Sequence, residues 1–170
     1  MFAPLLAASL LLHSAAAAPA AADATIEGAA DAAAAPATAS QEALLQALSA
    51  RDAGPDCAAL SAMSPTPVVD LTWIALNAPM PPWAGMRAAE CLITAHHAAA
   101  MPTLRAWVTD PELAGFGILV LNKLDVLPLD TAKELATLAL TKGPDVEKAR
   151  KRIARSKVPE IQALSGLPAK

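Results

Sequence analysis

Residues 86–111 read MRAAECLITAHHAAAMPTLRAWVTDP, and this stretch decides the fold. Its composition favours helix, because alanine has the highest helix propensity and proline fits only where a helix begins. Asp110 and Pro111 form a strong start signal: aspartate caps the free amides of a first turn, and proline fits that turn without losing a hydrogen bond. We predict one helix that includes residues 86–92, a second opened by Pro102, and a third that starts at the Asp-Pro pair.

Similar helix-start signals recur along the chain from Gln41 onward. Thr66 and Pro67 repeat the pairing of a cap with a proline, and residues 131–134 (TAKE) fit a capping box. Runs of β-branched and aromatic residues are nearly absent, and aromatic residues make up only 3% of the chain, so we predict an all-α fold. The prolines that separate the expected helices are Pro55, Pro67, Pro82, Pro102, Pro111, Pro128, Pro144 and Pro159.

Apolar positions also repeat when the chain is shifted by 28 residues, which aligns Leu92 with Val120 and Trp107 with Leu135. A helix pair that cannot bury its apolar face alone gains stability by stacking on the next pair. We therefore predict a short α-α superhelix of about four stacked helix pairs over residues 41–166. An irregular helical bundle is the alternative architecture.

These paired segments resemble the HEAT-like family of helical repeats. The resemblance covers roughly residues 55–165 and implies a curved scaffold that binds proteins, with no family catalytic residue to assign. It rests on a first helix at Met86–Leu92, a second opened by Pro102–Leu104, the start of the next pair at Asp110-Pro111, and Pro128 before the second helix of that pair.

The amino terminus is typical of an exported protein. Residues 5–12 form a short apolar core, and A-x-A-like sites follow, so residues 1–22 are predicted to be a signal peptide and the protein to be periplasmic or secreted. An uncleaved anchor is the alternative, but the core is shorter than the ~20 residues of a membrane span and lacks basic anchors. Residues 23–40 are predicted to be a disordered, Ala/Pro-rich linker, and residues 167–170 a short C-terminal tail.

The two cysteines form an even pair in a chain that we expect to be exported. Cys57 and Cys91 lie near equivalent places in what the repeat predicts to be successive first helices, so stacking could bring them within bonding distance. The sequence leaves two interpretations open. They either form a disulfide that holds a thin alanine-rich core together, or they are two small buried residues.

The histidine pair beside Cys91 raises the question of a metal or catalytic site. His96 and His97 are adjacent and point about 100° apart on a helix, and neither Glu90 nor Cys91 has the one-turn spacing of a helical metal pair. We expect instead that His96 shares the buried side of its helix with Leu92, and that His97 ends the helix. The sequence contains no recognised catalytic or phosphate-binding motif, and we predict no catalytic residue, cofactor or metal.

Charge is unevenly distributed along the chain. Residues 1–141 have a net charge of −8 and residues 142–170 a net charge of +5. The basic segment 145–157 either binds an anionic surface, such as lipid or polysaccharide, or forms the solvated polar face that ends a repeat stack. Nucleic acid is disfavoured because the segment lacks interleaved aromatic residues. The basic residues concerned are Lys148, Arg150, Lys151, Arg152, Arg155 and Lys157.

Trp83 is the candidate interface residue, because it lies in an apparent turn, Met80-Pro81-Pro82-Trp83, and a tryptophan that is partly exposed often anchors a partner. Covering a helix end is its alternative role. The sequence as a whole predicts an exported, non-catalytic helical-repeat scaffold for protein–protein interaction. The anionic-surface binder is the alternative function, with membrane contact at most peripheral. The sequence does not identify the protein partner, the binding face or the oligomeric state.

Overall fold

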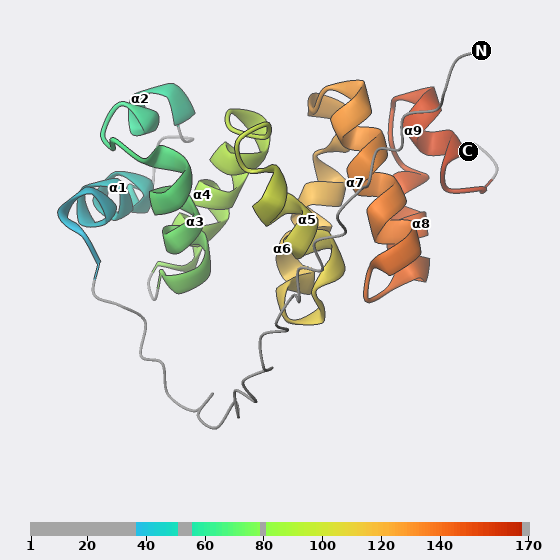
Figure 1. Cartoon of the computed structure of the whole chain (residues 1–170), viewed down its shortest axis with the longest axis horizontal. Helices are drawn as coiled ribbons and strands as arrows, with labels where there is room; N and C mark the ends of the chain where they lie inside the picture. The colour runs from blue at the N-terminus through green and yellow to red at the C-terminus, as the bar shows by residue number, and fades with distance from the viewer. Residues whose placement is uncertain (1–36, 51–55, 79–80, 168–170) are drawn as a thin grey trace, which may run out of the picture. The chain divides into compact units, whose positions relative to one another are not determined.

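A computed structural model describes residues 37–50, 56–78 and 81–167, and within these ranges the chain is helical and contains no strand (Figure 1). The predicted all-α fold is therefore confirmed for the described residues. The predicted signal peptide and residues 23–36 of the predicted linker lie outside them. The α-helices are α1 (Ala39–Ser49), α2 (Cys57–Ser61), α3 (Pro67–Asn77), α4 (Pro82–Thr94), α5 (Met101–Thr109), α6 (Ala114–Asn122), α7 (Leu129–Lys142), α8 (Val146–Ile153) and α9 (Pro159–Ala163), with 3-10 turns η1 (Pro111–Leu113) and η2 (Leu124–Val126).

Proline marks helix starts much as the sequence predicts. Pro67, Pro82 and Pro159 are the first residues of α3, α4 and α9, where the missing amide hydrogen would have no intrahelical acceptor. Asp110 accepts a hydrogen bond from the backbone N–H of Glu112 at 2.9 Å, and η1 leads from there into α6. The predicted capping box at residues 131–134 is wrong, because α7 already begins at Leu129, directly after Pro128.

The helices pack in chain order as antiparallel pairs. The pairs are α3 with α4, α5 with α6, and α7 with α8; α5 also packs on α7, α7 on α9, and α6 on α8. The sequence instead predicts that α4 pairs with α5 and α6 with α7, so the predicted pairs are shifted by one helix from the observed ones. The connection lengths explain the difference: three or four residues link α7 to α8 and α5 to α6, whereas six link α4 to α5, and short links make antiparallel neighbours.

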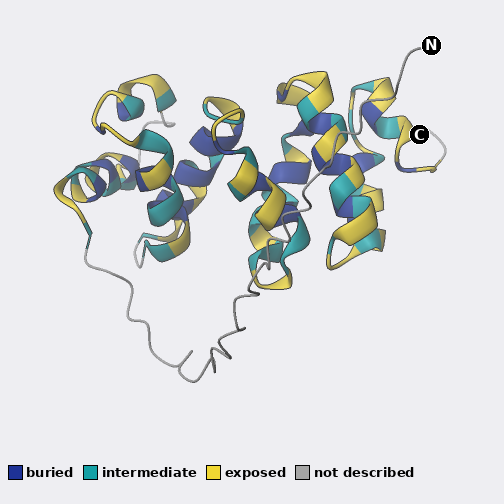
Figure 2. Ribbon diagram, in the orientation of Figure 1, coloured by how far each residue is buried: buried dark blue, intermediate teal, exposed yellow. Residues whose placement is uncertain are grey.

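Buried residues lie along the sides where the helices pack (Figure 2), and most of the buried apolar residues are alanine or leucine. Trp107 on α5 is the largest fully buried side chain, at 1% exposure, as its helical phase predicts. A methyl group added at Gly117 would lie 2.5 Å from the backbone oxygen of Trp107, so glycine allows α6 to approach α5 more closely than any other residue would. Because many buried side chains are small, the helix backbones approach one another closely and few bulky groups fill the space between them.

Candidate functional site

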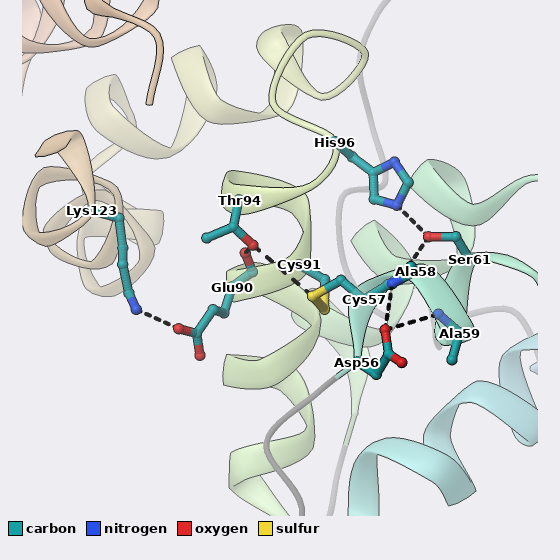
Figure 3. The surroundings of a disulfide bond; sticks show 10 residues. All are labelled: Asp56, Cys57, Ala58, Ala59, Ser61, Glu90, Cys91, Thr94, His96 and Lys123. Atoms are coloured by element: carbon teal, nitrogen blue, oxygen red, sulfur yellow. Dashed lines mark hydrogen bonds and ion pairs between the residues drawn. A yellow bond between two sulfur atoms is a disulfide. The ribbon is translucent and has the colours of Figure 1, made fainter. Parts of the chain in front are cut away.

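A disulfide joins Cys57, the first residue of α2, to Cys91 near the end of α4, with the two Cα atoms 5.3 Å apart (Figure 3). Of the two interpretations that the sequence leaves open, the structure thus has the bonded pair. The sequence prediction that the cysteines occupy successive repeat helices is wrong, because α2 has only five residues and no antiparallel partner of its own. The bond instead fastens a short helix to the buried face of α4.

The histidines lie beyond α4 rather than within it, so the prediction that His97 ends that helix is wrong. The α4 helix stops at Thr94, and both histidines are half-buried in the turn that leads to α5. His96 does not share the buried side with Leu92. Its Nε2 atom lies 2.6 Å from the hydroxyl oxygen of Ser61 on α2, close to the disulfide (Figure 3).

Glu90 and His96, which lie on either side of Cys91 in the sequence, interact with different parts of the molecule. Glu90 forms an ion pair with Lys123 on the side of α4 that faces away from the histidine (Figure 3). Across the described ranges, no three His, Cys, Asp or Glu side chains converge as metal ligands would. The disulfide and the Ser61–His96 hydrogen bond together hold α2 against the end of α4.

Asp70 on α3 forms a buried polar cluster that the sequence analysis did not anticipate. The residue is 3% exposed, and its carboxylate accepts hydrogen bonds from Ser40 Oγ at 2.8 Å, Gln41 Nε2 at 3.0 Å and Ser64 Oγ at 2.5 Å. Burial acts to raise the pKa of this carboxyl, but the donors, with the Thr66 hydroxyl among them, outweigh burial and lower the pKa. The cluster fixes the start of α1 to α3.

The opposite end of α1 is covered by α4. Trp83 lies in the first turn of α4 rather than in the predicted turn before it, and its indole N–H donates to the backbone oxygen of Ser49 at 3.3 Å. Arg87 donates to the backbone oxygens of Leu48, at 2.9 Å, and of Ala50. These donors meet the carbonyl end of α1, which carries the negative end of the helix dipole. Trp83 remains 36% exposed while it covers this helix end.

The basic residues of the C-terminal segment lie on α8 and in the turn after it. Arg152 is half-buried and donates to the side-chain oxygen of Asn122 at 3.1 Å, and Lys151 pairs with Glu147 at 3.3 Å. The other four side chains are exposed and have no carboxylate within ion-pair distance in the part of the chain that the structure describes. These four are Lys148, Arg150, Arg155 and Lys157.

An exposed apolar face on α3 was also missed by the sequence analysis. Val69, Trp73 and Leu76 follow one another at spacings of four and three residues, which puts them on one side of the helix. Val69 is 63% exposed, Leu76 is 45% exposed and Trp73 is half-buried. We call these three residues the α3 apolar face. Their spacing is visible in the sequence, but the same spacing also suits a core-facing helix, so the sequence does not reveal their exposure.

Comparison with known proteins gave no match: no family model, curated protein or solved structure is detectably similar to this chain. Among residues 37–50, 56–78 and 81–167, no helix combines the length and the apolar character that a membrane span requires.

Proposed function

We propose that this chain is an exported, non-catalytic helical scaffold, similar in organisation to HEAT-like repeats, that binds another protein through the α3 apolar face. The exposure of that face is the observation that carries the proposal. Val69 is the most exposed large apolar residue of the described chain, and Leu76 lies two helical turns further along the same side. Apolar side chains gathered on one helix face are typical of interaction surfaces.

The packing of the helices supports this choice of face. In the C-terminal half, α5 packs on α7 and α7 packs on α9, so each of these helices is covered by the next but one along the chain. The α3 helix packs on α1 and α4, and its outer side retains exposed valine and leucine. We expect the partner to contribute an amphipathic helix. The apolar side chains of such a helix would fit between the residues of the α3 apolar face, which are spaced at one and two helical turns.

Export is supported by the disulfide and by the amino-terminal sequence. Disulfides persist in oxidising compartments such as the periplasm and the extracellular space, and are rare in the cytosol. The Cys57–Cys91 bond therefore fits a secreted or periplasmic protein. Mass spectrometry of the mature protein tests this part: we expect a chain that begins near residue 23 and is lighter by two hydrogens than its reduced form. An intact Met1 with free thiols would contradict export.

A matched pair of valine substitutions tests the binding face. Val69 on α3 and Val126 on η2 are 63% and 62% exposed, so replacing either by glutamine changes surface chemistry equally without removing core contacts. A photoreactive group at Leu76 captures the partner from envelope fractions, and mass spectrometry identifies it. The purified partner is then titrated against both variants. We expect V69Q to weaken binding about tenfold and V126Q to leave it unchanged. Equal affinities for the two variants would refute the assignment of this face.

A second function, binding of an anionic surface, is favoured by four exposed basic side chains that pair with no carboxylate among the described residues. Lys148, Arg150, Arg155 and Lys157 lie within ten residues of one another on α8 and the following turn. Such a cluster attracts polyanions in a salt-dependent way, because screening weakens exposed charges. The tests are retention on heparin-like resin and on vesicles containing anionic lipid.

Two double variants, each of which removes two positive charges, test whether the α8 cluster is responsible for this binding. The double variant R150Q/R155Q removes two cations that lack ion-pair partners, whereas R105Q/K123Q removes two that are paired, with Glu134 and Glu90 respectively. We expect only the first double variant to elute at lower salt and to lose binding to anionic vesicles. Equal shifts for both would mean that net charge, and not the α8 cluster, governs retention.

A further inference from the structure

A cavity opens between two successive helix pairs, α5–α6 and α7–α8. Its volume is about 130 Å³, and its walls come from all four helices and the turn before α8. The lining is apolar except at one side, where two exposed polar residues, Asp145 and Lys148, form the rim. The apolar walls include Trp107, Ile118, Leu121, Ala114, Ala139 and Ala149.

Small residues explain why the helices do not fill this space. Gly143 allows close contact here, because a methyl group there would lie 2.4 Å from the backbone oxygen of Ala139 and 3.1 Å from that of Val108. Glycine is thus required to bring the turn before α8 against α5 and α7. Alanine at positions 139 and 149 then leaves α7 and α8 without the bulky side chains that would occupy the space between them and Trp107. Stacking on Phe116, at a ring-centroid distance of 4.7 Å, fixes the indole of Trp107 in the wall.

The size and chemistry of the cavity define what it can hold. An apolar cavity of on the order of 150 Å³ accepts a benzene-sized molecule and stays dry without it. At the rim, the carboxylate of Asp145 accepts the backbone N–H of Lys148 at 2.8 Å and so caps the first turn of α8. The ammonium of Lys148 has no carboxylate within ion-pair distance in the described chain, and it is the one cation on the rim.

We propose that this cavity binds a small carboxylic acid, with its aromatic ring or short apolar chain among the side chains of α5 to α8 and its carboxylate beside Lys148. The cation at the mouth selects the acid over a neutral or basic molecule of the same size, while the carboxylate of Asp145 is engaged by the backbone N–H of Lys148. This ligand site is separate from the α3 apolar face, so it does not depend on the proposed partner.

Benzoate is the probe, with benzyl alcohol and benzylamine as molecules of matched size. Binding to the full mature chain is followed by NMR through the indole N–H of Trp107, which lies in the wall, with the indole of Trp83 as an internal reference outside the cavity. We expect saturable shifts of the Trp107 signal with a dissociation constant on the order of 1 mM. Benzyl alcohol should bind about two- to fivefold more weakly, as for an exposed ion pair, and benzylamine more weakly still.

Two matched pairs of variants complete the test. Ala114→Leu fills the cavity from its lining, whereas Gly115→Leu places the same side chain at the next position, where a Cβ atom would meet nothing within 4 Å. Lys148→Gln removes the rim cation, and Arg150→Gln removes an exposed cation that does not line the cavity. We expect benzoate shifts to disappear in A114L and to weaken about two- to fivefold in K148Q, with G115L and R150Q unchanged. No saturable shift in the wild type, equal binding in A114L and G115L, or equal affinity for benzoate and benzylamine would each overturn the proposal.

Discussion

At the scale of single residues, Asp70 forms a buried polar cluster that joins α1 to α3. Its buried carboxylate accepts hydrogen bonds from α1 and from the segment before α3, and all of these donors are neutral. Asparagine at this position would retain one acceptor oxygen but turn an amide donor toward the hydroxyl groups. We expect Asp70→Asn to lower the free energy of unfolding by about 2–4 kcal/mol, measured by urea denaturation. Asp130→Asn, at an exposed position on α7, is the control and should have almost no effect.

The lowered pKa of Asp70 makes this stabilisation depend on pH. A carboxyl whose pKa is lower in the folded than in the unfolded protein stabilises the fold above its unfolded pKa, about 3.9 for aspartate. The stabilisation is lost as the pH falls through the lower folded value. We therefore expect the stability difference between wild type and D70N to stay constant from pH 7 to about pH 5 and to shrink below about pH 4. A difference that does not change down to pH 2 would show that the ionised form contributes nothing.

Two glycines of α6 provide a matched test of helix packing. A methyl group at Gly117 would lie 2.5 Å from the backbone oxygen of Trp107, whereas one at Gly115 would meet nothing within 4 Å. We expect Gly117→Ala to lower the unfolding free energy by about 1–3 kcal/mol through overpacking. Gly115→Ala should leave it unchanged or raise it by up to about 1 kcal/mol, since alanine is the better helix former. Thermal denaturation of both variants distinguishes them, and similar melting temperatures would mean that α6 can shift away from α5.

At the scale of elements, α2 depends on its connections to α4. Five residues are too few for a stable helix in isolation, and Leu60 is the only residue of α2 that is buried. Replacing both Cys57 and Cys91 by alanine should lower the unfolding free energy by about 3–4 kcal/mol, as expected for a loop of sequence separation 34. Hydrogen exchange should accelerate first in α2. Ser61→Ala, which removes the hydrogen bond to His96 and the one that the hydroxyl donates to the backbone oxygen of Cys57, should have a smaller effect of about 1 kcal/mol. Unchanged protection of α2 in the cysteine variant would show that packing alone holds it.

Helix starts were the elements most open to prediction from sequence, because their cause is local. Pro67 marks the start of α3, where Thr66 makes no side-chain capping hydrogen bond, and Asp110 with Pro111 marks the start of η1. The pairing of the helices was not predictable in the same way, because it depends on the lengths of the connections on either side of α5. The 28-residue repeat aligns apolar positions but contains no information about which connection is shorter. The Asp70 cluster was missed for a similar reason: two of its donors, Ser40 and Gln41, lie about thirty residues away along the chain. A disulfide was one of two interpretations open from the sequence, because an even pair of cysteines behind an export-like amino terminus is informative without knowledge of the fold.

At the scale of the whole domain, the order of helix contacts determines how far a local defect spreads. Apart from α1, which packs on α4 as well as on α3, each helix packs mainly on its neighbours within two positions along the chain. Coupling between α3–α4 and α8–α9 therefore has to pass through α5, α6 and α7. Such a stack is stabilised by nearest-neighbour terms and opens from its ends. Removing a fully buried side chain at one end should therefore leave the other end protected.

Leu71→Ala on α3 and Ile153→Ala on α8 test this coupling from opposite ends. Both side chains are fully buried, at 0% exposure, and each truncation should destabilise its own surroundings by about 2–4 kcal/mol. With native-state hydrogen exchange, we expect L71A to accelerate exchange in α1, α3 and α4 more than in α7 and α8, and I153A to give the reverse pattern. If both variants instead raised exchange equally in every helix, the described residues would unfold as one cooperative unit. In that case the contacts of α5 and α6 with both ends would be strong enough to suppress independent opening, and the stack would behave as a single core.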